Sequence, residues 1–418
     1  MSVPDPEIIH RLVASVFRFD SFALGDPLKT YVARYEGELL LDSSLAYDRL
    51  AEALRPYDLV PLFRLEGGRQ VIVLMRGVHR FVMPKVTANL VLFALTLLSV
   101  LFAGAMYSYT GPMPCDTWGS IQTLLLNLWT GWPFALTLLG ILLAHEFGHY
   151  FAGRLNKTAV TLPYFIPFPI SLLGTMGAFI QLKERPRNKR VLFDIGVAGP
   201  LAGLIVALPL LYLGLRLSTT GVVENTVYFR EAGACEICPT NAPPGGSYTC
   251  PGDNLLEGNS VLYLAMKYLA KGELLPAPPV YNRPAALYWI EYLFTSHPIP
   301  IGGQDVMLHP VAMAAWAGLL VTFLNLIPAG QLDGGHILYA LFDKRARLLL
   351  PFVLGTTVLM GFFWSGWWLW AGLIFLLGRA HAEPLDQITN LDPRRKIIGG
   401  FMLLVFLLVM TPVPFIVF

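Results

Sequence analysis

The stretch FALTLLGILLAHEFGHYFAGR, residues 134–154, combines an apolar run with three polar side chains near its end. It is about as long as the roughly 20 residues that an α-helix needs to cross the hydrocarbon core of a bilayer. His145 and His149 are four residues apart, so on a helix they share one face and could hold one Zn²⁺ together. Glu146 would lie beside that ion, where a carboxylate can act as a base. The stretch therefore predicts a transmembrane helix that carries a metal site.

The composition of the whole chain favours a membrane protein. Of its 418 residues, 55% are hydrophobic and only 14% are charged. The apolar residues are concentrated in runs of about the membrane-spanning length, which a soluble enzyme would not show. The candidate spans are 87–109, 134–154, 191–215, 308–343 with an interruption, 348–363, 365–380 and 397–416. We therefore expect a polytopic α-helical membrane protein with about six to seven transmembrane helices.

The segment before the first span, residues 1–80, alternates strand-like and helix-like patterns. A strand is expected at 31–35, a helix at 43–54, and a hairpin over 59–74 that turns at two consecutive glycines. These patterns predict a small N-terminal α/β domain, followed by a membrane domain over residues 85–418. The N-terminal segment has no visible catalytic constellation, so a regulatory or docking role is expected.

Positive charges predict the orientation of the spans. Lys and Arg precede the first span, whereas the loop 111–133 contains neither. The basic residues assigned to the same side are Arg69, Arg76, Arg80, Lys85, Arg154, Lys157, Lys183, Arg185, Arg187, Lys189, Arg190, Lys344, Arg345, Arg347, Arg394, Arg395 and Lys396. Because cytoplasmic loops carry the excess of Lys and Arg, we expect a multi-pass protein with a cytoplasmic N-terminal domain.

The four cysteines lie in the two loops that this topology places outside: Cys115, Cys235, Cys238 and Cys250. Disulfides persist in oxidising compartments, so one or two bridges are expected there. The sequence leaves their pairing open. Cys235 and Cys238 could alternatively form half of a zinc site, but the chain has no second Cys-x-x-Cys pair.

The larger outer loop, residues 217–305, contains two short amphipathic pieces at 261–269 and 286–294. Such pieces are expected to lie as helices on the outer leaflet, with the lipid bilayer as their partner. The net charge of the chain is only +2, and no nucleic-acid partner is expected.

A candidate for a third metal ligand lies far from the two histidines. A catalytic zinc keeps three protein ligands and leaves its fourth position to water. The stretch NLIPAGQLDGG, residues 325–335, interrupts an apolar span with a proline and three glycines and contains Asp333. An ionisable residue at membrane depth is costly unless it pairs with a cation or a metal. A broken helix is tolerated there only when it is buried in protein or lines a polar cavity. Asp333 is therefore the predicted third ligand.

Two motifs of this chain together resemble those of the site-2 protease family of intramembrane metalloproteases. The first is the pentapeptide His145–His149, and the second runs from Asn325 through Pro328 to the triplet Leu332–Gly334. The resemblance extends from about residue 85 to the C-terminus, and the pattern is similar to that of the bacterial and plastid branch. Because the start of the chain lacks a transit-peptide composition, a bacterial plasma membrane is expected rather than a plastid membrane.

This resemblance implies an intramembrane zinc endopeptidase that acts on transmembrane proteins or peptides. The implied zinc ligands are His145, His149 and Asp333. Glu146 would activate a water molecule, and Asn325 would orient the substrate or stabilise the developing negative charge. The alternative is a metal-binding membrane protein without proteolytic activity, such as a transporter, a sensor or an inactive adaptor. Ligation alone does not require Glu146, and a transporter would be expected to show repeated halves.

A transmembrane substrate must be unwound locally before its backbone can be cut. Residues 160–165 and 177–182 are typical of short strands, and Gly174 and Gly177 would permit tight turns. The edge of this membrane-associated hairpin could bind an extended substrate by strand addition, an arrangement that the family resemblance also implies. The alternative is a hairpin that only packs against the helices.

Two other features of the spans are expected to be structural. Gly199 and Gly203 form a Gly-x-x-x-Gly pair, which is typical of closely packed helices and predicts no catalytic role. Asp194 lies at the cytoplasmic end of its span, where a carboxylate interacts favourably with the helix dipole.

Overall fold

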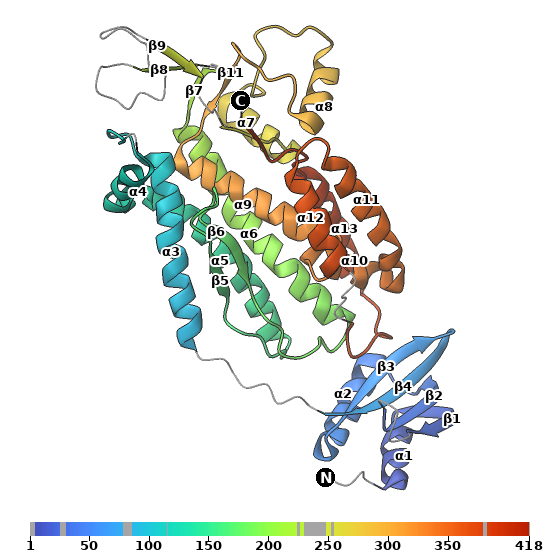
Figure 1. The fold of residues 1–418 in the computed structure, drawn as a ribbon. Helices are drawn as coiled ribbons and strands as arrows, with labels where there is room; N and C mark the ends of the chain where they lie inside the picture. The colour runs from blue at the N-terminus through green and yellow to red at the C-terminus, as the bar shows by residue number, and fades with distance from the viewer. Residues whose placement is uncertain are drawn as a thin grey trace.

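The computed structural model describes residues 5–25, 31–77, 86–114, 116–223, 226–229, 248–251, 255–378 and 383–417. A small α/β body lies at the N-terminal end, and a bundle of long helices lies beyond it (Figure 1). Cys115, Cys235 and Cys238 lie outside the described residues, as does the side chain of Cys250. The disulfide prediction therefore stays a prediction.

The N-terminal body is a four-stranded antiparallel sheet in the order β1-β2-β4-β3, with two helices packed on it. Its elements are α1 (Pro6–Ala14), β1 (Phe17–Leu24), β2 (Ala33–Leu39), α2 (Ser43–Leu54), β3 (Leu59–Glu66) and β4 (Arg69–Arg76). The helix and the hairpin that the sequence predicts are confirmed, and Gly67 and Gly68 adopt positive φ in the turn. The sequence patterns missed α1 and β1.

The bundle is built around α5, α6 and α9, which pack closely on one another in a shared apolar core. Its helices are α3 (Val86–Ser108), α4 (Thr117–Leu126), α5 (Trp132–Leu155), α6 (Lys189–Leu217), α9 (Pro310–Leu326), α10 (Asp333–Phe342), α11 (Leu350–Met360), α12 (Gly366–Leu377) and α13 (Pro393–Val409). Between α5 and α6, the antiparallel hairpin of β5 (Tyr164–Pro167) and β6 (Thr175–Phe179) packs against α3 and α5.

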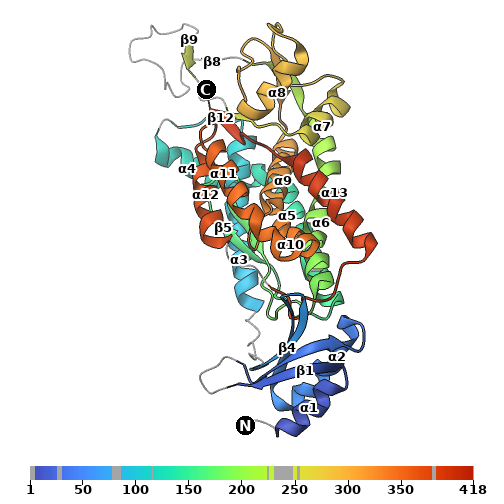
Figure 2. The same ribbon diagram turned by 90° about the vertical axis from the view of Figure 1, so that its right-hand side faces the viewer.

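Among the described residues, three helical stretches are long and apolar enough to cross a membrane: Val86–Ser108, Leu128–Leu155 and Lys189–Leu217. The prediction of six to seven spans is not confirmed. α11 and α12 have 11 and 12 residues, so each is roughly 17 Å long. The hydrocarbon core of a bilayer is about 30 Å thick. These two helices pack side by side as a short hairpin (Figure 2).

The loop over residues 217–305, here called the outer loop after its predicted side, is tied to the ends of two bundle helices by short sheets. Its elements are β7 (Thr219–Val222), β8 (Thr226–Phe229), β9 (Tyr248–Pro251), β10 (Leu255–Glu257), α7 (Val261–Lys271), α8 (Ala285–Thr295) and β11 (Gln304–Met307). β11 pairs with β7 directly after α6, and β10 pairs with the C-terminal strand β12 (Phe415–Val417) beyond α13. The two amphipathic helices predicted from the sequence are confirmed as α7 and α8.

Three buried charged side chains, Lys267, Glu257 and Asp305, hold this loop in place and are here called the outer cluster. The ammonium of Lys267, a fully buried residue of α7, lies 2.8 Å from a carboxylate oxygen of Glu257 and 3.2 Å from one of Asp305. The hydroxyl of Tyr263 donates a hydrogen bond to Glu257. Burial raises the pKa of Asp305 to about 6, although Lys267 opposes this shift. The cluster joins α7 to β10 and β11.

The segment between α12 and α13 joins the bundle to the N-terminal body. The backbone N–H of Phe63 donates to Leu385, and the N–H of Gln387 donates back to Phe63, so this segment lies parallel to β3 as an added edge. Asp386, between them, is fully buried and accepts a hydrogen bond of 2.8 Å from the hydroxyl of Ser43 in α2. The sheet of the N-terminal body is thus extended by residues from far along the chain.

Candidate metal centre

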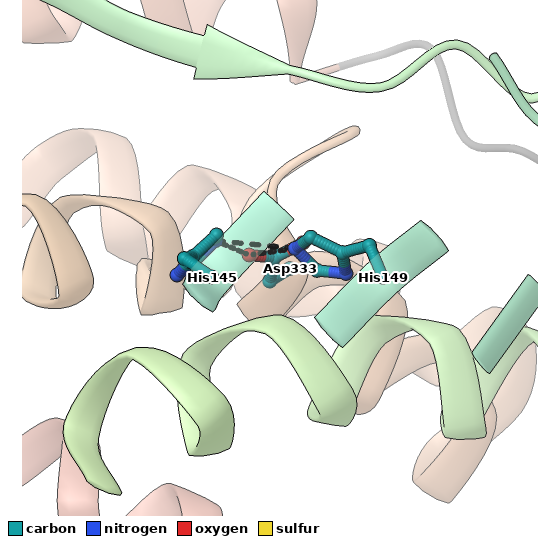
Figure 3. A group of neighbouring side chains, drawn as sticks. All are labelled: His145, His149 and Asp333. Atoms are coloured by element: carbon teal, nitrogen blue, oxygen red, sulfur yellow. Dashed lines mark hydrogen bonds and ion pairs between the residues drawn. The ribbon is translucent and has the colours of Figure 1, made fainter. Parts of the chain in front are cut away.

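Three potential metal ligands from two distant helices converge in the bundle. His145 and His149 lie one turn apart on α5, and Asp333 is the first residue of α10 (Figure 3). The Oδ2 atom of Asp333 lies 3.3 Å from Nε2 of His145 and 3.3 Å from Nε2 of His149. The two Nε2 atoms are 3.1 Å apart. The predicted ligand set is therefore brought together, with all ligand atoms within 4.8 Å of one another.

The break between α9 and α10 brings Asp333 to this point. α9 ends at Leu326, and the chain turns before α10 begins at Asp333. A Cβ atom on Gly334 would lie 1.9 Å from the carbonyl oxygen of Leu326, and one on Gly335 would lie 2.5 Å from that of Gly330. Only residues without a side chain permit this close approach of backbone to backbone. The two glycines that follow Asp333 therefore permit the tight turn that directs it toward α5.

The chemistry of these donors suits a metal cation. Two imidazole nitrogens and one carboxylate oxygen form a ligand set that is common for catalytic zinc. His145 and His149 are buried, and the side chain of Asp333 is 15% exposed. In the described parts of the chain, the ion pairs of Asp333 involve these two imidazoles and no Lys or Arg. A buried carboxylate without a cationic side chain is costly, and a bound cation would remove this cost.

Helix α6 orients and accommodates the two imidazoles. Nδ1 of His149 lies 2.7 Å from the carbonyl oxygen of Ile195. Because a carbonyl can only accept, Nδ1 carries the proton and Nε2 is free for a metal. A Cβ atom on Gly199 would lie 2.0 Å from Nε2 of His149, and one on Gly203 would lie 3.3 Å from Nδ1 of His145. The glycine pair thus makes room for the ligands, a role that the sequence analysis missed.

The two predicted catalytic residues also lie at this centre. Glu146 is buried on α5, and the backbone N–H of Ile180, just after β6, lies close enough to interact with its carboxylate. The amide nitrogen of Asn325 lies 3.3 Å from Nε2 of His145. A carboxylate that could accept a proton and an amide that could donate a hydrogen bond therefore flank the metal ligands.

The two glycines predicted to bind substrate differ in their surroundings. Gly174 has φ +71°, and a Cβ atom there would lie 2.5 Å from the carbonyl oxygen of Ser99, so this glycine lets the hairpin pack closely on α3. Gly177 has φ +100°, and an added Cβ would meet nothing within 4 Å. Of the two, Gly177 is the one with free space beside it.

The sequence matches a known family over the region that holds this centre. Residues 133–364 match the model of peptidase family M50. This region covers more than half of the chain and contains every metal ligand and catalytic candidate named above. The chain belongs to peptidase family M50.

Curated relatives carry names of the same kind. The chain is 30% identical over 309 residues to the "probable zinc metalloprotease EGY1, chloroplastic" of Oryza sativa subsp. japonica, an alignment that covers 73% of this chain and 43% of that protein. It is 26% identical over 426 residues to the "probable zinc metalloprotease EGY2, chloroplastic" of Arabidopsis thaliana, covering 98% and 65% respectively. The chain thus spans between about two fifths and two thirds of these relatives. No solved structure matches the chain.

Proposed function

We propose that this chain is an intramembrane zinc metalloendopeptidase that hydrolyses peptide bonds in or near transmembrane segments. The observation that carries the proposal is the convergence of His145, His149 and Asp333 inside an apolar bundle. Glu146 follows His145 on α5 and is buried as well. A site that only binds metal would not require this additional carboxylate. Membership of peptidase family M50 and the names of the plant relatives support the same reaction and the same metal.

Each residue of the proposed site has a separate role in peptide hydrolysis. When bound, zinc would polarise the scissile carbonyl and lower the pKa of water. Glu146 takes a proton from the attacking water and passes it to the nitrogen of the leaving amine. Asn325 donates a hydrogen bond to the oxygen on which negative charge develops. The carbonyl of Ile195 holds the imidazole of His149 in the tautomer that ligation needs.

We propose that the β5–β6 hairpin presents the substrate to Glu146. The interaction of the Ile180 N–H with Glu146 supports this role, because it puts the end of β6 near the proposed catalytic carboxylate. The free space beside Gly177 would let an extended peptide approach the backbone of β6. Transmembrane protein or peptide segments are therefore the proposed substrates.

The family and the three long apolar helices support a membrane location, and we propose that the chain crosses the membrane several times. We propose that the N-terminal body, residues 1–80, forms a cytoplasmic domain, which the excess of basic residues on that side supports. The plant relatives are named chloroplastic, so they do not favour a bacterial plasma membrane over a plastid membrane.

The outer helices α7 and α8 are proposed to lie in the outer leaflet. Between them lies a cavity of about 380 Å³ with an entirely apolar lining, which includes Leu264, Tyr268, Trp289 and Ile290. The one lysine in the middle of α7, Lys267, faces away from this cavity into the outer cluster. An apolar face on helices beside the end of a membrane span fits lipid acyl chains.

Metal content tests the proposed function without a known substrate. Detergent-purified wild-type protein is expected to contain about one zinc per chain by elemental mass spectrometry. His145→Ala and Asp333→Ala are expected to lose it, whereas His297→Ala, at an exposed histidine of the outer loop, keeps it. Metal-free wild-type protein, or full zinc in Asp333→Ala, would contradict the three-ligand site. Full zinc without cleavage of any reconstituted transmembrane peptide would favour the non-proteolytic alternative.

A further inference from the structure

Three consecutive residues of α6 contact three different elements around the metal centre. Ile195 accepts the hydrogen bond from His149 of α5. A Cβ atom on Gly196 would lie 3.5 Å from the carbonyl oxygen of Asp333, so this turn also packs against the start of α10. Asp194 accepts two hydrogen bonds from Arg395 of α13, of 2.7 Å from Nε and 2.6 Å from Nη2. One turn of α6 therefore links both metal-bearing helices to α13.

We infer that the Asp194–Arg395 ion pair is a positioning device for the metal ligands. By holding this turn of α6 against α13, the pair fixes the carbonyl that orients His149 and the backbone that supports the start of α10. This inference rests on the proposed metal site and adds residues that do not touch the metal. From the sequence, Asp194 is expected only to interact with the helix dipole, and the structure gives it a specific partner 201 positions away.

The position of Arg395 argues for a role beyond the stability of its own helix. Arg395 lies in the first turn of α13, which begins at Pro393. A cation is unfavourable at that end of a helix, because the helix dipole is positive there. Two carboxylates compensate for this, since Arg395 also donates a bond of 2.6 Å to Asp392. The paired contact to Asp194 needs the planar guanidinium, which a lysine ammonium cannot reproduce.

The pair is the last of several contacts along the start of α6. In the connector before α13, the N–H of Leu385 donates to Pro186 and the N–H of Asp386 donates to Arg187, at 2.9 and 2.7 Å. Further along, Arg190 donates to the carbonyl of Asn390 at 2.9 Å. The same connector extends the sheet of the N-terminal body. One strip of chain, residues 385–395, therefore runs from that body to the turn that orients His149.

Measurement of zinc affinity distinguishes a role in positioning the metal ligands from a role only in the stability of the fold. In full-length protein, Arg395→Gln and Asp194→Asn should each lower zinc affinity roughly tenfold, the smaller end of the effect seen when a residue that orients a ligand is removed. Arg395→Lys should restore little of the loss, because it keeps the charge but not the paired geometry. Affinity is measured by competition with a chromogenic chelator, and thermal unfolding is recorded alongside it.

Two controls isolate the contact to α6. Asp392→Asn removes the other partner of Arg395 without touching α6, and Arg394→Gln removes the exposed neighbouring charge; both should keep wild-type zinc affinity. The absorption spectrum of the Co²⁺-substituted protein should shift in Arg395→Gln and stay unchanged in the controls. If Arg395→Gln is poorly folded, the double variant Asp194→Arg/Arg395→Asp, which exchanges the two charges, provides a second test. Higher zinc affinity in the double variant than in either single variant supports the inference.

The outcomes distinguish this inference from the proposed function. Wild-type affinity and an unchanged Co²⁺ spectrum in both Arg395→Gln and Asp194→Asn would overturn the positioning role while leaving the metal site intact. Equal losses in the Asp392→Asn control would also overturn it, because the effect would then not depend on α6. A wild-type protein that binds no metal would instead refute the proposed function, and the inference with it.

Discussion

The metal centre and the outer cluster both bury ionisable side chains, but they are neutralised in different ways. In the outer cluster, Lys267 lies between Glu257 and Asp305, so the chain itself supplies a cation. At the metal centre, the described residues around Asp333 supply two imidazoles and no Lys or Arg. A buried ion pair that includes its own lysine holds structure together, whereas a buried carboxylate that faces two imidazoles and no Lys or Arg suits a metal cation.

The two sites also differ in how the backbone supports them. The candidate metal ligands lie on helices whose close approach depends on glycines, such as Gly199 against His149 and Gly334 against Leu326. The outer cluster instead links a helix to two strands, β10 and β11. The first arrangement holds its side chains rigidly in helices, as the proposed catalytic site would require. The second holds a loop in place. Variants at the metal centre should therefore change zinc affinity, whereas variants at the outer cluster should change the stability of the fold.

The largest effect is expected from Asp333→Ala. Removal of one of three ligands should lower zinc affinity by roughly a hundredfold or more, because metal affinity is shared among a few ligand bonds. Proteolysis should be lost as well, while the outer cluster and its contribution to stability stay unchanged. Chelator competition and thermal unfolding of the same sample test this contrast. Unchanged zinc affinity in Asp333→Ala would show that Asp333 is not a metal ligand, and the contrast between the two sites would then fail.

Glu146→Gln should abolish hydrolysis and leave metal binding intact. Glutamine keeps the shape of the side chain but cannot accept the proton of water, and loss of a general base typically lowers rates by about 10²- to 10⁴-fold. The test is cleavage of a reconstituted transmembrane peptide, with zinc content measured on the same protein. Retained hydrolysis would show that Glu146 is not the base.

Gly199→Ala should weaken zinc binding although it changes no ligand. Its Cβ atom would lie 2.0 Å from Nε2 of His149, so the imidazole must move. We expect zinc affinity to fall roughly tenfold or more. Gly140→Ala, on α5, is the matched control, because its Cβ would meet nothing within 4 Å. Equal affinities of the two variants in chelator competition would mean that the ring can shift without affecting ligation.

Lys267→Met should reduce stability and leave the metal centre unaffected. The variant leaves Glu257 and Asp305 buried without their cation, which typically costs about 3–5 kcal/mol. The unfolding temperature should fall and zinc affinity should stay at the wild-type value. Lys344→Met, at an exposed lysine, controls for the loss of charge. Normal stability of Lys267→Met would indicate that water or protonation replaces the ion pair.

The smallest effect concerns pH and Asp305. Burial raises its pKa from 3.8 to about 6 in the folded protein. Between these values the folded state holds a proton that the unfolded state has released, so the contribution of this group to the free energy of unfolding falls as pH rises. Asp305→Asn lacks this contribution. The difference in unfolding temperature between wild type and Asp305→Asn should therefore change between pH 4 and pH 6.5, and a constant difference would contradict the shift.

Much of the metal centre follows from short-range patterns in the chain. The spacing of His145 and His149 needs only the 3.6-residue period of a helix, and the cost of a lone carboxylate in an apolar span singles out Asp333. The glycines and proline around Asp333 predict the helix break for the same local reason. The hairpin at Gly67 and the helices α7 and α8 were likewise predictable from turn residues and amphipathic periodicity.

Other features depend on contacts between residues far apart in the chain, where no local period applies. Arg395 reaches Asp194 across 201 positions, and Ser43 reaches Asp386 across 343 positions. Apolar runs alone also leave the number of spans unconfirmed, because hydropathy does not reveal where a helix ends, and α11 and α12 have only 11 and 12 residues. Helix periodicity and the cost of burying charge thus predict the candidate metal ligands of this protein from its sequence. The packing of α5, α6, α10 and α13 determines which residues position these ligands, because contacts between distant side chains form only when the helices pack together.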